Sequence, residues 1–271
     1  MTAGDVQTSP RIVLGLGLIA IGRTWGYKNP EIPSSEVAEE LLRASLALGV
    51  TYLDTAPSYG VSELRLGQFL SKLRCAERNG LTVATKFGEH WDEDRGVPYV
   101  DHSYDALARS LEQSLSRLGR IDALQLHKAS LEVLQSRNFN RAIRLATSLG
   151  IAALGASTGK VNVAYIALRH ERLAFIQVPF NWQYPAMQKV LTLAATLGKT
   201  IVVNRPFGEG RLLYDDAGAP FGESAIEKAL EFVLHRLAHG VVLVGTRSVN
   251  HLRQTFDVFQ RILEGRDSLW A

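Results

Sequence analysis

The sequence predicts a (β/α)8 TIM barrel built as one α/β domain. Three observations support this fold. Short apolar runs alternate with helical patterns, eight such runs occur, and the 271 residues are close to the roughly 250 that this fold typically has. Because no linker or shift in composition divides the chain, we expect a single domain over residues 1–271, with residues 1–10 as a flexible N-terminal tail.

Eight short segments have the composition of parallel strands that are covered on both faces. In chain order they are Arg11–Leu16, Val50–Leu53, Leu81–Thr85, Ile121–Leu126, Ile151–Gly155, Leu173–Val178, Thr200–Val203 and Gly240–Val244. Each is followed by a helical or mixed segment, as a barrel of alternating strands and helices requires.

Helices are predicted most clearly at Glu36–Leu48 and Tyr104–Leu118, where apolar residues recur at spacings of three and four. Glycines stand between helical patterns and strands, where a helix C-cap is expected; they are Gly49, Gly80, Gly150, Gly198 and Gly240. Three long segments follow strands and are expected to be irregular loops at the carboxyl end of the barrel: Ile21–Ser34, Phe87–His102 and Asn204–Phe221.

Composition excludes several classes of protein. The net charge of +3 comes from acids and bases that are scattered along the chain, so there is no nucleic-acid footprint. No run approaches the roughly 20 apolar residues of a membrane helix, and the first ten residues lack an apolar core. Cys75 is the single cysteine, which excludes an intramolecular disulfide and a cysteine metal cluster. We expect a cytoplasmic protein that acts on small molecules, and we assign no metal ligand.

Reactive side chains close successive predicted strands. Asp54 ends the second run, and Tyr59 follows on the turn beyond it. Lys86 ends the third run and His127 the fourth. Because the carboxyl ends of barrel strands meet on one face, where such enzymes place their active sites, these four residues are candidate catalytic residues.

The residue types indicate a chemistry. Lys86 at the end of an apolar run needs a counter-charge, and Asp54 on the neighbouring strand can supply it. The ammonium is expected to lower the pKa of Tyr59, whose phenol otherwise titrates near 10. His127 is expected to hydrogen-bond a carbonyl oxygen or to share the proton with Tyr59. Such groups around one oxygen suit carbonyl reduction, with hydride coming from a cofactor.

Four motifs then carry a family resemblance. They are Asp-Thr-Ala-x-x-Tyr-Gly-x-Ser-Glu-x-x-Leu-Gly (Asp54 to Gly67), Ala-Thr-Lys (Ala84 to Lys86), Leu-Gln-Leu-His (Leu124 to His127) and Ile-Gln-Val (Ile176 to Val178). In their order and spacing, from about Val13 to about Phe256, the chain resembles the aldo-keto reductases. The resemblance implies a barrel that interconverts an aldehyde or ketone and an alcohol with NADP(H), NAD(H) being the alternative. It implies Tyr59 as general acid or base, Lys86 and Asp54 as its assistants, and His127 as the residue that orients the carbonyl.

The resemblance also places the cofactor. It assigns Ser157 and Gln177 to the nicotinamide carboxamide and the segment Gly245 to Arg253 to the adenosine phosphate end, where arginines beside a helix N-terminus suit a phosphate. Three departures stand out: Thr158 where the family usually has Asn, Asn204-Arg205-Pro206-Phe207 where an aromatic residue commonly stacks on the nicotinamide, and Gln254-Thr255 in place of Glu-Asn. The candidate cofactor contacts are Ser157, Thr158, Gln177, Asn204, Arg205, Gly245, Thr246, Arg247 and Arg253.

Plainer interpretations stay open for several of these residues. Asp54 by itself could cap a turn, and Gln177 could satisfy loop backbone groups. Arg247 and Arg253 could be solvated helix charges. Trp25 and Trp91 fall in loops after strands; we favour a place in the substrate pocket over one that merely seals the barrel.

Other functions also remain to be weighed. A non-catalytic sensor or accessory subunit could bind NADP(H) on the same barrel, and a Schiff-base aldolase could use Lys86. The stretch Gly15-Leu16-Gly17-Leu18-Ile19-Ala20 matches a dinucleotide-binding fingerprint. It lacks the expected helix after it and an acid about 20 residues on, so we interpret the match as coincidental.

Overall fold

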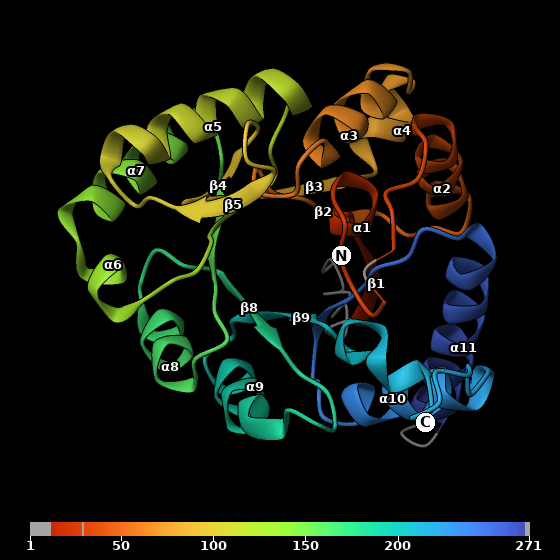
Figure 1. Cartoon of the computed structure of the whole chain (residues 1–271). Coiled ribbons are helices and arrows are strands. Elements are labelled where there is room, and N and C mark those ends of the chain that lie inside the picture. Colours follow the sequence, from red (N-terminus) through yellow and green to blue (C-terminus); the bar gives the residue numbers. More distant parts are fainter. Residues whose placement is uncertain (1–11, 29, 269–271) are drawn as a thin grey trace, which may run out of the picture.

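Eight parallel strands close into a barrel, which confirms the predicted fold (Figure 1). The computed structural model describes residues 12–28 and 30–268, so the predicted tail at residues 1–10 lies outside the described part. Around the barrel the strands follow the order β1-β10-β9-β8-β7-β6-β3-β2. They are β1 (Ile12–Gly17), β2 (Tyr52–Asp54), β3 (Thr82–Phe87), β6 (Ala123–Leu126), β7 (Ala153–Ser157), β8 (Phe175–Pro179), β9 (Thr200–Asn204) and β10 (Gly240–Val244).

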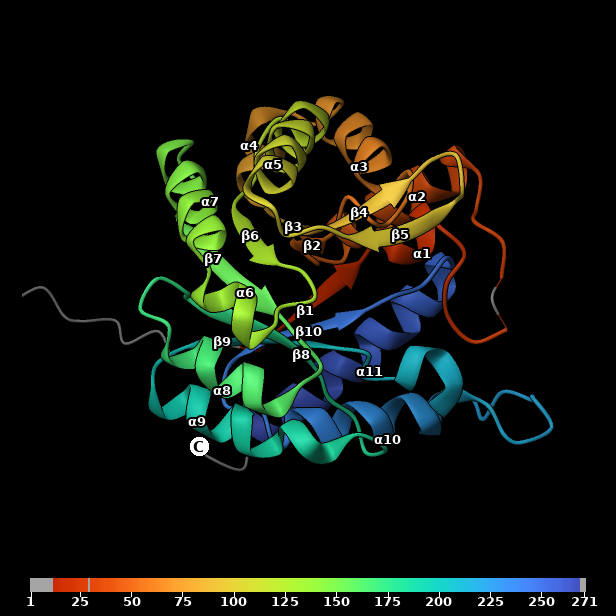
Figure 2. The same cartoon turned by 60° about the vertical axis from the view of Figure 1, so that its left-hand side comes forward.

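Helices surround the barrel and cover the outer faces of its strands (Figures 1 and 2). They are α1 (Ile19–Gly22), α2 (Ser35–Ala47), α3 (Ser62–Ser71), α4 (Cys75–Asn79), α5 (Tyr104–Leu118), α6 (Leu131–Gln135), α7 (Arg137–Ser148), α8 (Val161–Arg169), α9 (Gln188–Thr196), α10 (Glu223–Leu234) and α11 (Val249–Ser268), with 3-10 turns at η1 (Pro185–Met187) and η2 (Gly208–Leu213). None of the helices in the described part is long and apolar enough to span a membrane.

The apolar side chains form two separate clusters. The larger one lies between strands and helices, and the smaller one fills the barrel interior with Ala84, Ala123, Phe175 and their neighbours. Gly15 belongs to this interior, since a Cβ there would lie 2.7 Å from the Leu243 side chain and 2.8 Å from that of Val241. Close packing in the barrel therefore accounts for a glycine of the apparent dinucleotide fingerprint. The four-residue helix α1 that follows was expected to be loop.

Local capping explains several helix ends. Ser34 and Ser103 accept hydrogen bonds from Val37 and Ala106 at the starts of α2 and α5. The predicted cap glycines Gly49, Gly150 and Gly198 adopt the left-handed conformation that favours glycine. Gly80 is the C-cap of α4, as predicted, but with a φ of −76°, outside the left-handed region. Gly240 is the first residue of β10 rather than a helix cap.

The segment Phe87–His102 is not the irregular loop that was predicted. Phe87 ends β3, and after Gly88 the chain forms an antiparallel hairpin of β4 (Glu89–Asp92) and β5 (Val97–Val100). Figure 2 shows this hairpin on the side toward which the arrows of β1 and β10 point. Its first strand starts at Glu89, which is buried, so the hairpin delivers a carboxylate to the carboxyl end of the barrel.

Candidate active site

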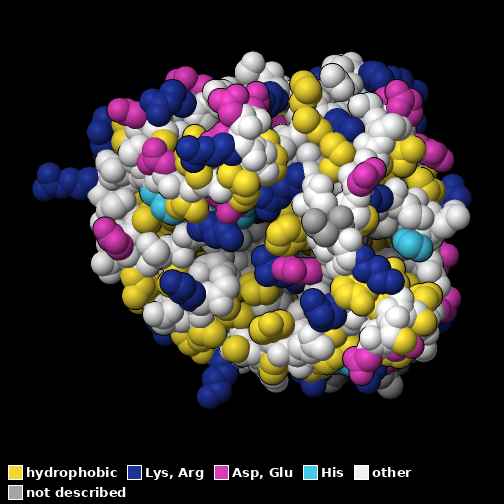
Figure 3. Space-filling view, in the orientation of Figure 1, with side chains coloured by type: hydrophobic (Ala, Val, Ile, Leu, Met, Phe, Trp, Pro, Cys, Tyr) yellow, Lys and Arg dark blue, Asp and Glu magenta, His cyan; other side chains and the backbone are white. Residues whose placement is uncertain are grey.

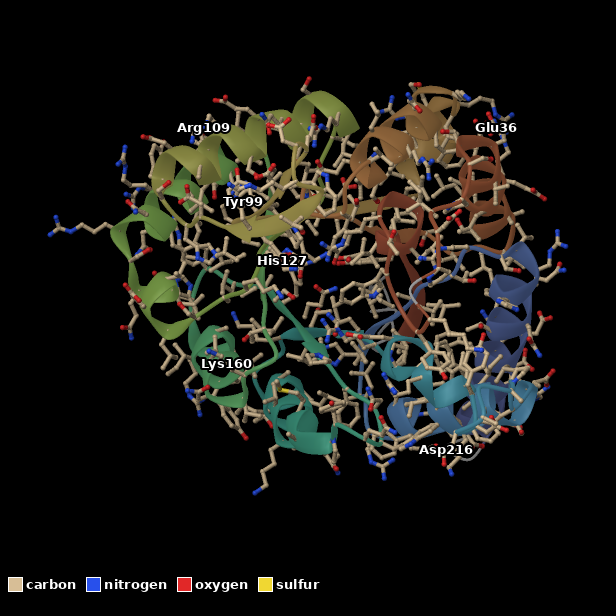
Figure 4. The ribbon with its side chains drawn as sticks, viewed as in Figure 1. Glu36, Tyr99, Arg109, His127, Lys160 and Asp216 are labelled. Carbon is tan, nitrogen blue, oxygen red and sulfur yellow. The ribbon has the colours of Figure 1, made fainter. Side chains whose placement is uncertain are left out.

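A cavity of about 1040 Å³ opens where the barrel strands end. In Figure 3 the face seen in Figure 1 is hollowed near its centre, and Lys and Arg side chains gather around the hollow. His127, at the end of β6, lies near the middle of this face, below the hairpin that carries Tyr99 (Figure 4). The cavity lining includes twelve of the sequence-predicted site residues: Trp25, Asp54, Tyr59, His127, Ser157, Thr158, Gln177, Asn204, Arg205, Gly245, Thr246 and Arg247.

Strand register brings Asp54 and Lys86 together. Asp54 pairs with Ala84 across β2 and β3, and the Lys86 Nζ donates to Asp54 Oδ1 at 2.5 Å and to the Thr55 carbonyl at 2.9 Å. Both side chains are almost fully buried. Gln125 donates to the other Asp54 oxygen at 2.9 Å, so the carboxylate is held on two sides. Burial lowers the pKa of Lys86, but Asp54 and Tyr59 raise it more, and the net direction is upward.

The Lys86 ammonium lies 4.7 Å from the centre of the Tyr59 ring. Burial raises the pKa of Tyr59, while Lys86 lowers it, and burial dominates, so the net pKa is above the ordinary value. The expectation that the ammonium would bring the phenol below its usual pKa is therefore wrong. Lys86 acts in the predicted direction and offsets part of the effect of burial. The phenol keeps its proton at neutral pH, as a proton donor requires.

His127 has a partner that sequence reasoning missed. Its Nδ1 lies 3.0 Å from Oε2 of Glu89, the buried residue that opens β4. Burial lowers the pKa of His127 more than Glu89 raises it, so the imidazole is neutral at neutral pH. A neutral ring that donates from Nδ1 to a carboxylate carries its lone pair on Nε2. The Tyr59 and His127 rings stand 6.0 Å apart between centroids, nearly perpendicular to each other.

Glu89 is stabilised as an anion. Ser58 donates to its Oε2 at 2.8 Å, and the Lys128 Nζ lies 3.5 Å from its Oε1. Burial raises the pKa of Glu89, but the hydrogen bonds and charges of His127, Ser58 and Lys128 outweigh this and lower it to about 2. The sequence signal for this hairpin was the turn-forming stretch Asp94-Arg95-Gly96, followed directly by the apolar run Val97-Pro98-Tyr99-Val100.

The end of the cavity next to β7, β8 and β9 has unmatched polar atoms. Gln177 Oε1 and Asn204 Oδ1 are buried without a hydrogen-bond partner in the described structure. Register places Ser157 beside Gln177. A carboxamide has an NH2 group that donates and a carbonyl oxygen that accepts, so the buried Gln177 amide oxygen beside the Ser157 hydroxyl fits it. Thr158 is less available, because its hydroxyl accepts from Lys160 N at 3.2 Å within its own loop.

The loop after β10 lines the other side of the cavity with Gly245, Thr246 and Arg247. The Arg247 guanidinium donates to the Trp25 carbonyl at 2.9 Å, while its Nε is buried without a partner. Arg253 lies on the exposed surface of α11 and does not line the cavity. The two arginines that the sequence grouped together therefore occupy different environments.

Two further predicted site residues, Arg205 and Trp91, differ in whether they line the cavity. Arg205 pairs with Glu209 at 2.7 Å and lies 5.5 Å from the centre of the Trp25 ring, within the cavity lining. Trp91 does not line the cavity. Its ring faces Arg23, whose guanidinium carbon is 5.6 Å away. No group of three or more His, Cys, Asp and Glu side chains that could hold a metal ion occurs in the part of the chain that the structure describes.

Comparison with known proteins identifies relatives of this site. A model of the aldo/keto reductase family matches residues 13–223. An oxidoreductase of unassigned activity from Schizosaccharomyces pombe is 27% identical over 264 residues, which cover 93% of this chain and 83% of the relative. A D-threo-aldose 1-dehydrogenase from a Pseudomonas species is 28% identical over 207 residues, which cover 66% of this chain and 62% of that enzyme.

Solved structures share the fold. A crystal structure from Pseudomonas aeruginosa, of a protein assigned to the aldo-keto reductases, superposes with a TM-score of 0.78 at 27% identity and covers 97% of this chain and 94% of that one. The glycerol dehydrogenase of Gluconobacter oxydans superposes with a TM-score of 0.72 at 24% identity, covering 96% of this chain and 89% of that one. This second likeness supports the fold alone.

Proposed function

The chain belongs to the aldo/keto reductase family and is an oxidoreductase, and we propose that it interconverts an aldehyde or ketone and the corresponding alcohol with NADP(H). The observation that carries the proposal is the position of Tyr59 in the cavity, with the buried Lys86 ammonium 4.7 Å from its ring and the His127 ring 6.0 Å away. A phenol that keeps its proton beside a fixed cation is suited to donate to an oxygen that gains negative charge.

In reduction, Tyr59 donates its proton to the carbonyl oxygen, and the Lys86 ammonium stabilises the phenolate that remains. Asp54 holds Lys86 in place through the 2.5 Å contact and does not itself transfer a proton. The neutral His127, with its lone pair on Nε2, accepts a hydrogen bond from the hydroxyl group that forms. In the oxidative direction the same residues act in reverse, and Tyr59 receives the proton.

The residues along the cavity fit a nicotinamide cofactor. Gln177 and Ser157 would hold the carboxamide, because the unpartnered Gln177 Oε1 can accept from its amide. The Arg247 guanidinium and the loop that leads into α11 would hold the phosphate end. When bound, the nicotinamide supplies the hydride in reduction or accepts it in oxidation. The preference for NADP(H) over NAD(H) belongs to the proposal, as does a cytoplasmic location.

Named relatives support this reaction class. The Pseudomonas enzyme is called an aldose 1-dehydrogenase, an oxidoreductase of sugars. The buried pair of Lys86 with Asp54 speaks against a Schiff-base aldolase, since a lysine with a raised pKa is a poor amine nucleophile.

An assay in both directions tests the function. Purified protein is mixed with NADPH and a panel of aldehydes and ketones, and with NADP+ and the matching alcohols, while absorbance of the reduced nicotinamide is followed. We expect turnover with at least one pair. If NADPH binds but no carbonyl compound and no alcohol is converted, the chain is a cofactor-binding sensor and the proposed activity is wrong.

A further inference from the structure

Arg23 occupies an unusual position in the cavity. It follows α1 directly and lines the cavity together with Tyr59. Its Nε is buried without a hydrogen-bond partner, and its guanidinium forms no ion pair within residues 12–28 and 30–268. A guanidinium has five N–H donors in a planar fork, and it stays charged in proteins. A partly buried guanidinium whose N–H groups have no acceptor costs free energy, unless a ligand supplies acceptors for them.

Aromatic rings hold the guanidinium where it is. Its carbon lies 5.3 Å from the ring centre of Trp25, 5.6 Å from that of Trp91 and 6.0 Å from that of Tyr59. These rings contribute cation–π attraction but accept no conventional hydrogen bonds. The planar fork is therefore oriented in advance while its N–H groups remain available.

The other charges close to Tyr59 are already matched. Lys86 is paired with Asp54, and Glu89 lies within 3.5 Å of Lys128 and 3.0 Å of His127. Arg205, which also faces Trp25, is paired with Glu209. Arg23 has no ion pair among the described residues. Glu89, which is already paired with His127 and Lys128, raises the pKa of Arg23 from a longer distance, but burial outweighs this and lowers it.

We propose that Arg23 binds a carboxylate of the substrate, so that the preferred carbonyl compound is an oxo acid and the preferred alcohol a hydroxy acid. The proposal rests on the proposed function, because it takes Tyr59 as the proton donor. Arg and carboxylate form two parallel charge-assisted hydrogen bonds, and Trp25, which lines the cavity, would flank the chain that links the two groups. Trp91 contacts the Arg23 guanidinium from outside the cavity lining. Because Arg23 and Tyr59 are so close, this chain is short.

Matched acid and ester pairs test the proposal directly. The probes are glyoxylate with methyl glyoxylate, and pyruvate with methyl pyruvate, in which the carboxyl group is next to the carbonyl. We expect wild-type protein to have the higher kcat/KM for the acid of at least one pair. In Arg23→Gln, kcat/KM for that acid should fall by about 10- to 100-fold, mainly through KM, while the ester changes by less than about twofold. Arg23→Lys keeps the positive charge but not the planar guanidinium. Its kcat/KM for the acid should lie between the values for wild-type protein and Arg23→Gln.

A control separates direct contact from general charge. Arg211 lies 5.5 Å from the Tyr27 ring at the margin of the cavity but does not line it. Arg211→Gln removes the same charge and should leave the ratio of acid to ester unchanged. If Arg23→Gln lowers acid and ester equally, Arg23 only supports the aromatic rings and the proposal is wrong. A weaker affinity for NADPH in Arg23→Gln would likewise overturn it, by making Arg23 a cofactor contact.

Binding without turnover distinguishes this proposal from the proposed function. Benzoate is titrated into wild-type protein and Arg23→Gln, with and without NADP+, and tryptophan fluorescence reports occupancy next to Trp25. We expect wild-type protein to bind benzoate and Arg23→Gln to bind it at least about 10-fold more weakly. Binding that depends on Arg23 in a protein without turnover would contradict the proposed function alone. If wild-type protein converts esters and acids equally well and binds benzoate no more tightly than Arg23→Gln does, the carboxylate site is wrong, while the proposed function stands.

Discussion

The Glu89 carboxylate lies 3.0 Å from Nδ1 of His127, and this contact decides which ring nitrogen faces the cavity. With Nδ1 as donor to Glu89, Nε2 is left as an acceptor in the neutral ring. Glu89 comes from the β4–β5 hairpin and His127 directly follows β6, so the hairpin acts on His127 through the Glu89 side chain. His127 is then suited to the alcohol form of the substrate.

Replacing Glu89 with Gln tests this role as a positioning residue. Glu89 raises the pKa of His127 against the effect of burial, so Glu89→Gln should lower that pKa and move the acidic limb of the pH–kcat/KM profile to lower pH. At neutral pH we expect kcat/KM to fall by about 10-fold, less than the loss of a direct proton donor costs. Glu93→Gln on the exposed tip of the same hairpin is the control. An unchanged profile in Glu89→Gln would show that the contact only supports the fold.

The pair of Asp54 and Lys86 should matter for stability as well as for activity. Asp54→Asn leaves the Lys86 charge buried without its partner and should lower the free energy of unfolding by about 3 kcal/mol. The double variant Asp54→Asn with Lys86→Met removes both charges and should be more stable than Asp54→Asn alone. Urea denaturation measures the free energy of unfolding of both variants. Equal stability of Asp54→Asn and wild-type protein would mean that the pair is not buried as described.

Gln177→Leu tests the proposed carboxamide contact. Gln177 Oε1 has no partner in the described structure, while Gln177 Nε2 donates to Asp54 Oδ2 at 3.4 Å. Losing this one long hydrogen bond should lower the free energy of unfolding by no more than about 1 kcal/mol. We expect the Kd for NADPH and the Kd for NADH to rise together by about 10-fold, since both cofactors carry the same carboxamide. Gln183→Leu, at an exposed position, serves as the control in the same fluorescence titration. A loss of stability without a change in Kd would favour the structural interpretation of Gln177.

Arg247→Gln tests the phosphate end of the cavity. If Arg247 binds the adenosine phosphate, its loss should raise the Kd for NADPH by about 10-fold and the Kd for NADH much less. Arg253→Gln should change either Kd by less than about twofold, because Arg253 is exposed outside the cavity. An equal loss for both cofactors in Arg247→Gln would point instead to its hydrogen bond with the Trp25 carbonyl.

The barrel and the close approach of four reactive side chains could both be predicted from the sequence. Both follow from the spacing of the apolar residues and from the order of strands and helices along the chain. Strand ends share one face in a parallel barrel, so Asp54, Tyr59, Lys86 and His127 had to meet once the strands were placed. The strand ends were close to those predicted: β2 ends at Asp54, β3 runs one residue past Lys86 to Phe87, and β6 ends at Leu126, directly before His127.

Glu89 and Arg23 were not found because their roles depend on tertiary contacts. Glu89 reaches His127 only after the chain bends at Gly88, and Arg23 is surrounded by three rings from three separate segments: Trp25, Tyr59 and Trp91. The pKa of Tyr59 was also misjudged, since its burial depends on how the loops close over it and a sequence gives no depth.

Tyr59→Phe tests the central claim most directly. The variant removes only the phenolic oxygen, so cofactor affinity and the free energy of unfolding should stay close to those of wild-type protein. On the best substrate of the wild-type enzyme, we predict that kcat for carbonyl reduction falls by at least about 100-fold in single-turnover measurements of NADPH oxidation. A Tyr59→Phe variant that reduces the same carbonyl compound as fast as wild-type protein would contradict Tyr59 as the proton donor.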